Sequence, residues 1–339
     1  MISLSKIRVL VVDDSLFFRE MLARGLAADA QIEVVATAAD PFEARDKILK
    51  YHPDVMTLDV EMPKMNGIEF LRKLMPQYPI PTIVISAANN CVFEAISLGA
   101  IDFVKKPDGQ SAAARQEFLD DLIFKVKTAV AAKIQATSPI AHNTVSKDHA
   151  MRVEMQLIAI GASTGGTVAL TNLLLSLEPP LPGIVVVQHI PPVFSDMFAK
   201  RLDLITKFHV KEAATGDRIL PGDVLIAPGD QHMKVKKIGS IYKVECCFGE
   251  KVNGHCPSVD VLFNSVAKLG DKTIGIIMTG MGFDGAKGLL SMRKAGARTI
   301  GQDEKTSVVY GMPKVAFNIG AVETQLPLDQ IGRKICSLI

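Results

Sequence analysis

The feature that most constrains the fold is a strict alternation of strand and helix patterns through the first 133 residues. Short runs rich in valine, isoleucine and leucine predict buried strands, and the amphipathic segments between them predict helices. The expected strands are Ile7–Val12, Ile32–Thr37, Val55–Asp59, Thr82–Ser86 and Asp102–Val104, and the expected helices are Ser15–Ala27, Pro41–Lys50, Gly67–Met75, Val92–Leu98 and Ala112–Lys133. This alternation is typical of a doubly wound parallel sheet, which binds ligands at the carboxyl ends of its strands.

Carboxylates follow two of these strands at the point where each strand ends. Asp13 and Asp14 come after the first strand, and Asp59 closes the third. Asp14 alone would be explained as a helix cap, but three converging carboxylates repel one another unless a cation binds them, and Mg²⁺ prefers such oxygen ligands. Ser86, which closes the fourth strand, and Lys106, after the fifth, add a hydroxyl and a cation to the same edge. The sequence therefore predicts a magnesium site beside a lysine suited to neutralise a phosphoryl group.

Length and composition restrict the class of protein. A chain of 339 residues predicts about two domains, and the net charge of +2 offers no strong attraction to nucleic acid or to an anionic membrane. No apolar run reaches the ~20 residues that span a bilayer, and the amino terminus runs directly into a strand without signal-peptide features. The five cysteines have no CxxC or metal-ligand spacing, which suits a reducing compartment. We expect a cytoplasmic protein without nucleic-acid partners or membrane insertion.

The second half of the chain is organised around a glycine-rich turn read as GASTGG. The apolar run Leu157–Ile160 predicts a buried strand before the turn, and an apolar face at helical spacing predicts a helix from Thr167 onward. Gly161, Ser163 and Gly165 fit the G-x-S-x-G pattern of a nucleophilic serine at a strand-to-helix turn. The helix amino terminus there offers N–H groups to a developing oxyanion. A phosphate cradle is the alternative, although no lysine follows the glycines as a P-loop requires.

A serine hydroxyl needs a base, and the base needs a group that orients it. Two further apolar strands are expected at Ile184–Val187 and Ile274–Thr279, and His189 and Asp284 follow them. If the sheet is parallel, Ser163, His189 and Asp284 lie on one edge, and this coincidence predicts a catalytic triad. Taken singly, His189 could be a hydrogen-bonded core histidine and Asp284 a helix N-cap.

Other side chains compete for these roles. His232 and His255 lie in loops, and either could line the pocket. Cys256 and the pair Cys246 and Cys247 lack an obvious base partner, so a cysteine nucleophile is the weaker alternative.

Two more segments complete the expected organisation. Val235–Ile238 and Ile241–Cys247 predict a β-hairpin. Residues 134–152 are polar and show no periodicity, so they predict a linker in which His142 and His149 are solvated spacers. The chain beyond this linker is rich in strands and glycine and is not basic, which argues against a DNA-binding helix-turn-helix.

Residues 1–133 resemble the receiver domain of two-component response regulators, which has a flavodoxin-like five-stranded fold. The matching residues are Val11–Ser15, Leu58–Pro63, Asn66-Gly67, Ser86-Ala87 and Lys105–Pro107. The resemblance implies that Asp59 accepts a phosphoryl group from a chemotaxis-type histidine kinase, with Mg²⁺ bound beside it. The implied metal ligands are Asp13 (mainly through water), Asp14, Asp59 and the main-chain carbonyl of Glu61. The resemblance also implies that Ser86 and Lys106 sense the phosphoryl group and that Phe103 occupies the aromatic switch position.

The second half resembles the catalytic domain of the chemotaxis protein-glutamate methylesterases, the CheB family. The matching residues are Ile160–Gly166, Gln188-His189, Ala227–Asp230, Pro257–Phe263, Met278–Gly282, Asp284–Ala286 and Gly311–Pro313. The chain order Ser, His, Asp differs from ordinary α/β-hydrolases, in which the acid precedes the histidine. We therefore expect a receiver domain at 1–133, a linker at 134–152 and a catalytic domain at 153–339. The catalytic domain is expected to be a mostly parallel α/β sheet with the β-hairpin.

This resemblance implies hydrolysis of glutamate methyl esters on methyl-accepting chemotaxis receptors, with release of methanol, and deamidation of receptor glutamines. Ser163 would attack the ester, His189 would move the proton, and Asp284 would orient the histidine. The main-chain N–H groups of Thr164 and Met281 would hold the oxyanion. No cofactor is expected for ester hydrolysis. The two-domain layout leads us to expect that the unphosphorylated receiver covers the catalytic cleft and that phosphorylation opens it.

Two positions depart from the family pattern. Gln231 and Cys256 stand where family members often carry a basic residue, so less positive charge is expected near the pocket for acidic receptor segments. Two other functions stay open: a receptor-binding regulator without catalysis, and a general serine esterase with a receiver domain.

Overall fold

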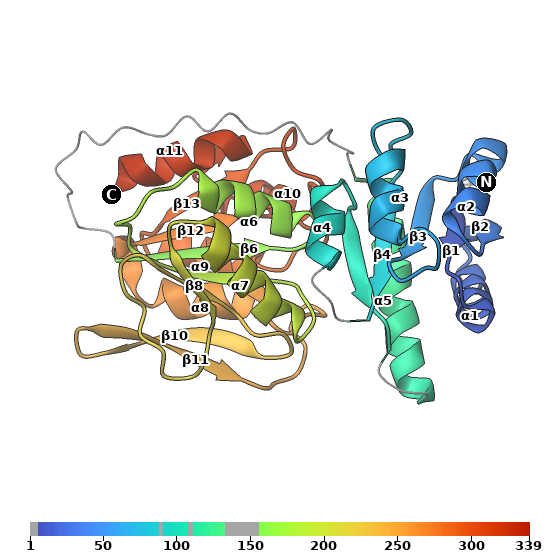
Figure 1. The fold of residues 1–339 in the computed structure, drawn as a ribbon. Coiled ribbons are helices and arrows are strands. Elements are labelled where there is room, and N and C mark those ends of the chain that lie inside the picture. The colour runs from blue at the N-terminus through green and yellow to red at the C-terminus, as the bar shows by residue number, and fades with distance from the viewer. Residues whose placement is uncertain (1–5, 88–90, 108–110, 133–155) are drawn as a thin grey trace. The chain divides into compact units, whose positions relative to one another are not determined.

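The computed structural model describes residues 6–87, 91–107, 111–132 and 156–339 of the chain. These residues form two compact units, and the division between the units falls within the segment 133–155 (Figure 1). The expected linker at 134–152, with His142 and His149, lies outside the described residues. The predicted domain limits therefore stay predictions.

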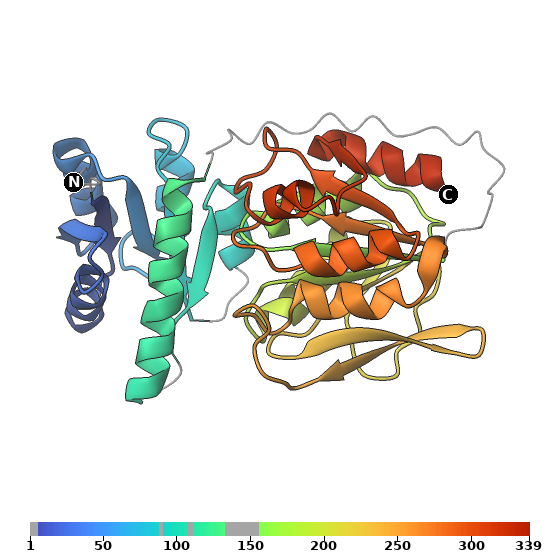
Figure 2. The ribbon, with the colours of Figure 1, turned by 180° about the vertical axis from the view of Figure 1, so that it is seen from behind.

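The first unit, in its described residues, is a five-stranded parallel sheet in the order β2-β1-β3-β4-β5. Its strands are β1 (Ile7–Val12), β2 (Ile32–Ala38), β3 (Val55–Asp59), β4 (Thr82–Ser86) and β5 (Asp102–Lys105), and its helices are α1 (Leu16–Ala27), α2 (Pro41–Tyr51), α3 (Gly67–Leu74), α4 (Cys91–Ser97) and α5 (Ala112–Val130). Figure 2 shows α5 lying across one face of this sheet. The strand order reverses between β1 and β3, which brings their carboxyl ends together. The expected doubly wound five-stranded sheet is confirmed.

Side chains immediately after the strands begin the helices of this unit. Ser15 is the N-cap of α1, and its hydroxyl accepts a hydrogen bond from the main-chain N–H of Phe18. Asp40 caps α2 and Asn66 caps α3 in the same way. Such caps satisfy N–H groups that a helix cannot bond internally. The helix-cap explanation of Asp14 is therefore wrong, because Ser15 takes that role.

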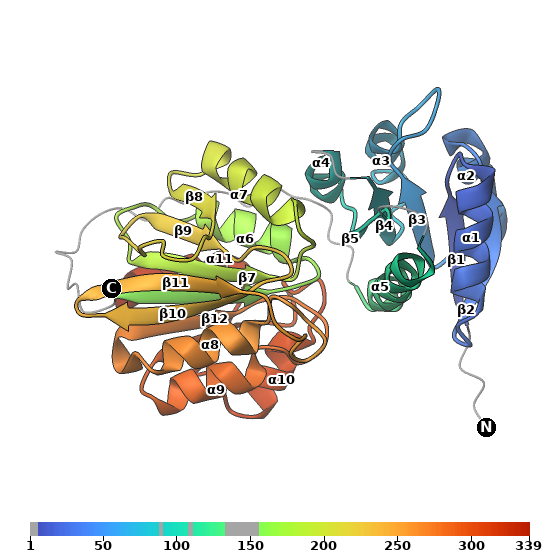
Figure 3. The same ribbon diagram turned by 90° about the horizontal axis from the view of Figure 1, so that it is seen from below.

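The second unit, in its described residues, contains a seven-stranded sheet in the order β14-β13-β12-β6-β7-β9-β8, and every neighbouring pair is parallel. Its strands are β6 (Leu157–Ala162), β7 (Gly183–Gln188), β8 (His209–Glu212), β9 (Asp223–Ile226), β12 (Thr273–Ile277), β13 (Arg298–Gln302) and β14 (Thr324–Leu326). The helices are α6 (Gly166–Leu175), α7 (Phe194–Ile205), α8 (Val259–Ala267), α9 (Ala286–Lys294), α10 (Met312–Asn318) and α11 (Leu328–Leu338). Figure 3 shows α6 and α7 on one face of the sheet and α8 and α9 on the other.

The expected β-hairpin is confirmed as a separate antiparallel pair, β10 (His232–Ile238) and β11 (Ile241–Cys247), which packs on α8. The three strands that the sequence predicts before the candidate triad residues lie side by side in the middle of the large sheet, in the order β12-β6-β7. They are buried along their whole length, which explains their continuous apolar sequence. Among the described residues, none of the helices combines the length and apolar character that a bilayer span requires.

Candidate functional site

Ser163 lies on the sharp turn between β6 and α6. The turn requires glycine at position 165 for two reasons. Gly165 has a φ of 77°, in the left-handed region that favours glycine, and a Cβ atom there would clash with Val308, whose Cβ would be only 2.6 Å away. The main-chain N–H of Ser163 donates to the carbonyl of Thr279 at 3.0 Å, and its carbonyl accepts from Gly166 at 2.7 Å. The sequence prediction of a serine at a strand-to-helix turn is confirmed in its geometry.

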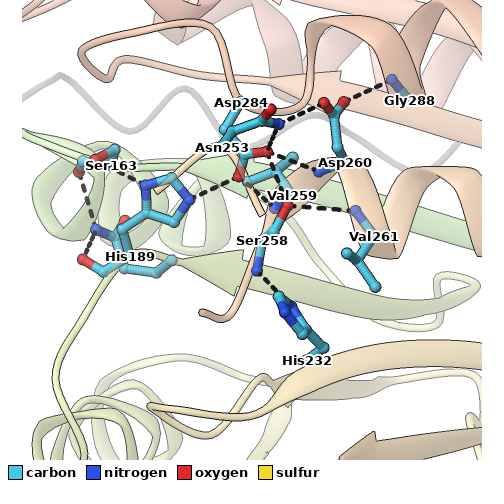
Figure 4. Close-up of polar contacts among 11 residues, drawn as sticks. Ser163, His189, His232, Asn253, Ser258, Val259, Asp260, Val261, Asp284 and Gly288 are labelled. Carbon is cyan, nitrogen blue, oxygen red and sulfur yellow. Dashed lines mark hydrogen bonds and ion pairs between the residues drawn. The ribbon is translucent and has the colours of Figure 1, made fainter. Parts of the chain in front are cut away.

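Ser163, His189 and Asp284 form a continuous line of hydrogen bonds, as Figure 4 shows. Ser163 Oγ lies 3.2 Å from His189 Nδ1, and His189 Nε2 lies 2.9 Å from Asp284 Oδ2. A carboxylate can only accept, so it fixes the ring hydrogen on Nε2 and leaves the lone pair of Nδ1 facing the serine hydroxyl. The three residues meet because β6, β7 and β12 are parallel neighbours whose carboxyl ends share one edge.

The Asp284 carboxylate is buried and accepts hydrogen bonds from four groups (Figure 4), with a fifth, longer bond of 3.3 Å from the N–H of Asp260. Oδ1 accepts from Ser258 Oγ and Asn253 Nδ2, each at 2.8 Å, and Oδ2 accepts from the N–H of Val259 at 2.7 Å as well as from His189. Burial raises the pKa of this carboxyl, but the hydrogen bonds and attraction of His189, together with those of Asn253 and Ser258, outweigh burial and hold the pKa well below its usual range. The geometry therefore keeps Asp284 ionised.

A second buried carboxylate, Asp260, lies next to this one. The amide of Asn253 donates to both, at 2.7 Å to Asp260 Oδ2 and at 2.8 Å to Asp284 Oδ1, and Asp260 Oδ1 accepts from the N–H of Gly288 at 2.6 Å. Burial raises the pKa of Asp260, and the nearby charge of Asp284 raises it further. Sequence reasoning missed Asn253 and Ser258. Ser258 could have been found as the N-cap that precedes the apolar pattern of α8.

The competing histidines take other positions. His232 is buried, its Nε2 lies 2.9 Å from the carbonyl of Glu250, and its Nδ1 accepts from the N–H of Ser258 at 3.2 Å. The ring of His255 stacks on the ring of His189, with 3.8 Å between centroids and 13° between planes. His189 is therefore the histidine that contacts both Ser163 and Asp284.

Two of the three candidate cysteines, Cys246 and Cys256, are poorly suited to act as nucleophiles. Burial raises the pKa of the Cys246 thiol to about 12, and burial also raises the pKa of Cys256. Because the reactive form of cysteine is the thiolate, both side chains are held in the less reactive state.

The two main-chain groups expected to bind an oxyanion belong to segments that meet at Ser163. Thr164 follows Ser163 in the turn, and Met281 follows Gly280 after β12. The main chain at Gly280 approaches the serine so closely that a Cβ atom there would lie 2.7 Å from Cβ of Ser163. This approach brings the Met281 peptide to the site, and the oxyanion role of Thr164 and Met281 stays a prediction.

The predicted acidic cluster is present in the first unit. Oxygen atoms of Asp13, Asp14 and Asp59 lie within 4.8 Å of one another. Lys106 Nζ lies 2.6 Å from Asp59 Oδ2 and 3.5 Å from Asp13 Oδ2. Within the described residues, Asp13 Oδ2 is buried without a hydrogen-bond partner. A buried carboxylate oxygen whose charge is met only by the more distant Lys106 ammonium, beside two further carboxylates, fits the preference of Mg²⁺ for oxygen ligands.

Burial, with a smaller contribution from charge repulsion, raises the pKa of two carboxyls in this cluster. Burial raises the pKa of Asp13 to about 6; attraction to Lys106 opposes this shift, and repulsion by Asp59 adds to it. Burial also raises the pKa of Asp59, against the hydrogen bond and the attraction of Lys106. One lysine does not fully compensate the buried carboxylates, so the cluster is suited to take up positive charge.

The remaining predicted residues of this unit surround the cluster. Ser86 is buried at the end of β4, and its carbonyl accepts from the N–H of Lys106 at 2.8 Å. The N–H of Glu61 donates to Asp59 Oδ1 at 3.1 Å. Phe103 is buried and packs edge-on against Phe93, with ring centroids 6.2 Å apart. The sensing, carbonyl-ligand and switch roles expected for Ser86, Glu61 and Phe103 stay predictions.

Comparison with known proteins assigns both halves of the chain. Residues 158–335 match the family model of CheB methylesterase, and residues 9–115 match that of the response regulator receiver domain. A relative named protein-glutamate methylesterase/protein-glutamine glutaminase 2, from Syntrophomonas wolfei subsp. wolfei, is 54% identical over 99% of this chain and 98% of its own length. The Salmonella typhimurium protein of that name, without the numeral, is 45% identical over 99% of this chain and 98% of its own length.

A solved structure supports the same assignment of the second unit. The crystal structure of the Thermotoga maritima CheB methylesterase catalytic domain is 37% identical, with a TM-score of 0.53, and the match covers 55% of this chain and 99% of that domain. The resemblance drawn from the sequence motifs is thus confirmed over both halves. The chain belongs to the CheB methylesterase family, as a member with a response regulator receiver domain ahead of its methylesterase domain.

Proposed function

We propose that this protein hydrolyses methyl esters of glutamate side chains on methyl-accepting chemotaxis receptors and releases methanol. The names of its relatives support protein glutamate methyl esters and protein glutamines as substrates, and we propose that both are on the receptors, so that deamidation of receptor glutamines is a second activity. The observation that carries the proposal is the hydrogen-bonded line from Ser163 through His189 to Asp284. It supports the catalytic roles expected for these residues and disfavours a regulator without catalysis.

Acylation begins when Ser163 Oγ attacks the ester carbonyl carbon and His189 Nδ1 takes the hydroxyl proton. Asp284 stabilises the resulting imidazolium through Nε2. The main-chain N–H groups of Thr164 and Met281 hold the negative oxygen of the tetrahedral intermediate, and the loss of one such donor typically costs about 3 kcal/mol of barrier. The intermediate collapses to an acyl-enzyme as His189 passes its proton to the departing methoxide, which leaves as methanol.

Deacylation repeats the sequence with water in place of the serine. His189 Nδ1 takes a proton from water, the hydroxide attacks the acyl carbon, and Ser163 leaves with the proton that His189 returns. The product is a glutamate carboxylate. A glutamine side chain follows the same route with ammonia as the leaving group, which is why one site supports both activities.

We further propose that the receiver domain controls this activity through phosphorylation of Asp59 by a chemotaxis-type histidine kinase. The Asp59 carboxylate attacks the phosphorus of the kinase phosphohistidine and becomes an acyl phosphate, as the P–N bond breaks and the kinase histidine leaves. Lys106, which is paired with Asp59 before the transfer, turns to the phosphoryl oxygens. Asp13, Asp14, Asp59 and the carbonyl of Glu61 would hold Mg²⁺, which when bound neutralises part of the phosphoryl charge. Ser86 and Phe103 are the proposed sensing and switch residues.

Methanol release from a methylated receptor signalling fragment tests both parts of the proposal. Wild type and Ser163→Ala are compared with and without Mg²⁺ and a small-molecule phosphodonor. We expect wild-type release that the donor stimulates and that the alanine variant lacks. Release that survives in Ser163→Ala would exclude the proposed nucleophile. Equal activity on free small esters and on the receptor fragment would instead favour a general serine esterase.

A further inference from the structure

The side chain of Gln188 contacts the main chain of both Ser163 and His189. Gln188 is the last residue of β7, is buried (3% exposed), and pairs in register with Ala162 of β6. Its Nε2 donates to the carbonyl of Ser163 at 2.9 Å and to the carbonyl of His189 at 3.1 Å. From this bridge we propose that Gln188 is a positioning residue, which sets the distance between the serine hydroxyl and the histidine ring. The inference rests on the proposed nucleophilic role of Ser163.

The surroundings fix the orientation of this amide. Both neighbours of Nε2 are carbonyl oxygens, so the reversed amide would place an acceptor against two acceptors. The amide oxygen lies instead against Gly166, at a place where a Cβ atom on that residue would be 2.1 Å away. Glycine at the start of α6 therefore makes room for the Gln188 side chain.

The contribution of this amide lies in its two donors. Within the described residues its oxygen is buried without a hydrogen-bond partner. Burying an acceptor without a partner costs folding free energy, and an apolar side chain of the same length would fill the same space without this cost. What the apolar side chain could not provide is the bridge between the two carbonyls.

The bridge matters because Gln188 restrains the main chain of both residues whose side chains react, Ser163 and His189. The carbonyl of Ser163 accepts from Gly166 and from Gln188, and His189 is held through its N–H by Ala162 and through its carbonyl by Gln188. The reacting atoms, Ser163 Oγ and His189 Nδ1, are 3.2 Å apart. A misplacement of about 1 Å lowers rates by roughly 100-fold. Because Gln188 is buried, its loss should change kcat and leave substrate binding intact.

The test replaces Gln188 by methionine, which is similar in length and has no donor. Two quantities are measured: kcat and KM for methanol release from the methylated receptor fragment, and the second-order rate at which a fluorophosphonate inactivates the protein by reacting with Ser163. We expect kcat and the inactivation rate to fall by roughly 100-fold, while KM stays within about threefold of wild type.

The matched control is Thr273→Val, another isosteric loss of a buried polar group. Thr273 starts β12 at the opposite end of the same sheet and donates to the carbonyl of Gly270 at 2.9 Å. We expect wild-type kcat, KM and inactivation rate for this variant, so a loss confined to Gln188→Met cannot reflect a general weakening of the sheet. If Gln188→Met does not fold, Gln188→Asn keeps the amide but is too short to bridge both carbonyls, and the same losses are expected.

The outcomes separate this inference from the proposed function. If wild type reacts with the fluorophosphonate and the folded Gln188 variant reacts at the same rate, the positioning role is overturned and the nucleophilic role of Ser163 stands. If KM rises while kcat holds, Gln188 acts on substrate binding and the inference is also overturned. If wild type does not react at all, the proposed nucleophile fails, and the role of Gln188 fails with it.

Discussion

Two buried aspartates, Asp59 in the receiver unit and Asp284 in the methylesterase unit, stand at the carboxyl edges of parallel sheets but in opposite electrostatic surroundings. Asp284 accepts hydrogen bonds from Ser258, Asn253, Val259 and His189, and its pKa lies well below the usual range because these bonds outweigh burial. Burial raises the pKa of Asp59, which shares its surroundings with two more carboxylates and one lysine. The same residue type thus carries a stable charge in one unit and a charge that one lysine only partly compensates in the other.

The difference shows how the surroundings of a carboxylate match its task. A carboxylate surrounded by fixed donors keeps its charge and geometry while a positive charge forms and disappears on His189, so the site is preorganised for a transient imidazolium. Carboxylates that repel one another gain more from a cation that arrives from outside, and this suits a site proposed to bind Mg²⁺ and a phosphoryl group. The predictions below test each side of this contrast.

The largest effect is expected for Asp284→Asn. An asparagine amide can donate to His189 Nε2, which would move the ring hydrogen to Nδ1 and remove the lone pair that faces Ser163. A change of this kind typically lowers kcat by about 10⁴-fold. The measurement is kcat for methanol release from the methylated receptor fragment.

Asp260→Asn is the matched control for that variant. Asp260 is also buried, but its carboxylate accepts from Asn253 and Gly288 rather than from His189. We expect a loss of less than about tenfold. Equal losses in the two variants would mean that the whole buried cluster, and not the histidine tautomer, limits the rate.

Asp59→Asn is expected to abolish stimulation by the phosphodonor and to leave basal methanol release at the wild-type level. An amide cannot form the acyl phosphate, and it removes one carboxylate from the repelling cluster. The check is the ratio of rates with and without donor at saturating Mg²⁺. Stimulation that persists in the variant would place the phosphoryl acceptor elsewhere.

Mg²⁺ affinity of the receiver unit should depend on pH. Burial raises the pKa of Asp13 to about 6; attraction to Lys106 opposes this rise, and repulsion from Asp59 adds to it. Below that pH a proton occupies Asp13 and competes with the cation, so affinity should fall by up to about tenfold per pH unit and level off above it. Isothermal titration calorimetry from about pH 5 to about pH 8, roughly one unit below and two units above this pKa, measures the change. A flat profile would contradict the role of Asp13.

The smallest effect is expected for Asn253→Ala. Asp284 would lose one neutral donor and keep those from Ser258, Val259 and His189. A hydrogen bond to a charged group contributes about 1.5–3 kcal/mol, but only the part that strengthens in the transition state affects kcat. We expect a kcat reduction of about tenfold or less, measured beside Asp284→Asn. A loss as large as that of Asp284→Asn would show that the bridge between the two carboxylates is essential.

The strands that the sequence predicts closely are those with continuous apolar runs. In the receiver unit the observed strands agree with prediction to within one residue. The clearest runs belong to β1, β3 and β4, whose β-branched residues are mostly buried on both faces. In the methylesterase unit, β8, β9, β13 and β14 were not predicted. They lie toward the two edges of the seven-stranded sheet, and two of them, β8 and β14, carry partly buried patterns without a distinct periodicity.

The sequence by itself determined the class of fold, the family and the residues Ser163, His189, Asp284 and Asp59 as candidates, because each follows a strand whose apolar run is evident. It could not determine which ring nitrogen of His189 faces the serine, nor that His255 stacks on that ring. Nor could it reveal that Gln188 bridges two carbonyls and that Asn253 bridges two carboxylates. These contacts join residues far apart in the chain, and only the packing of neighbouring strands and loops decides which donor meets which acceptor.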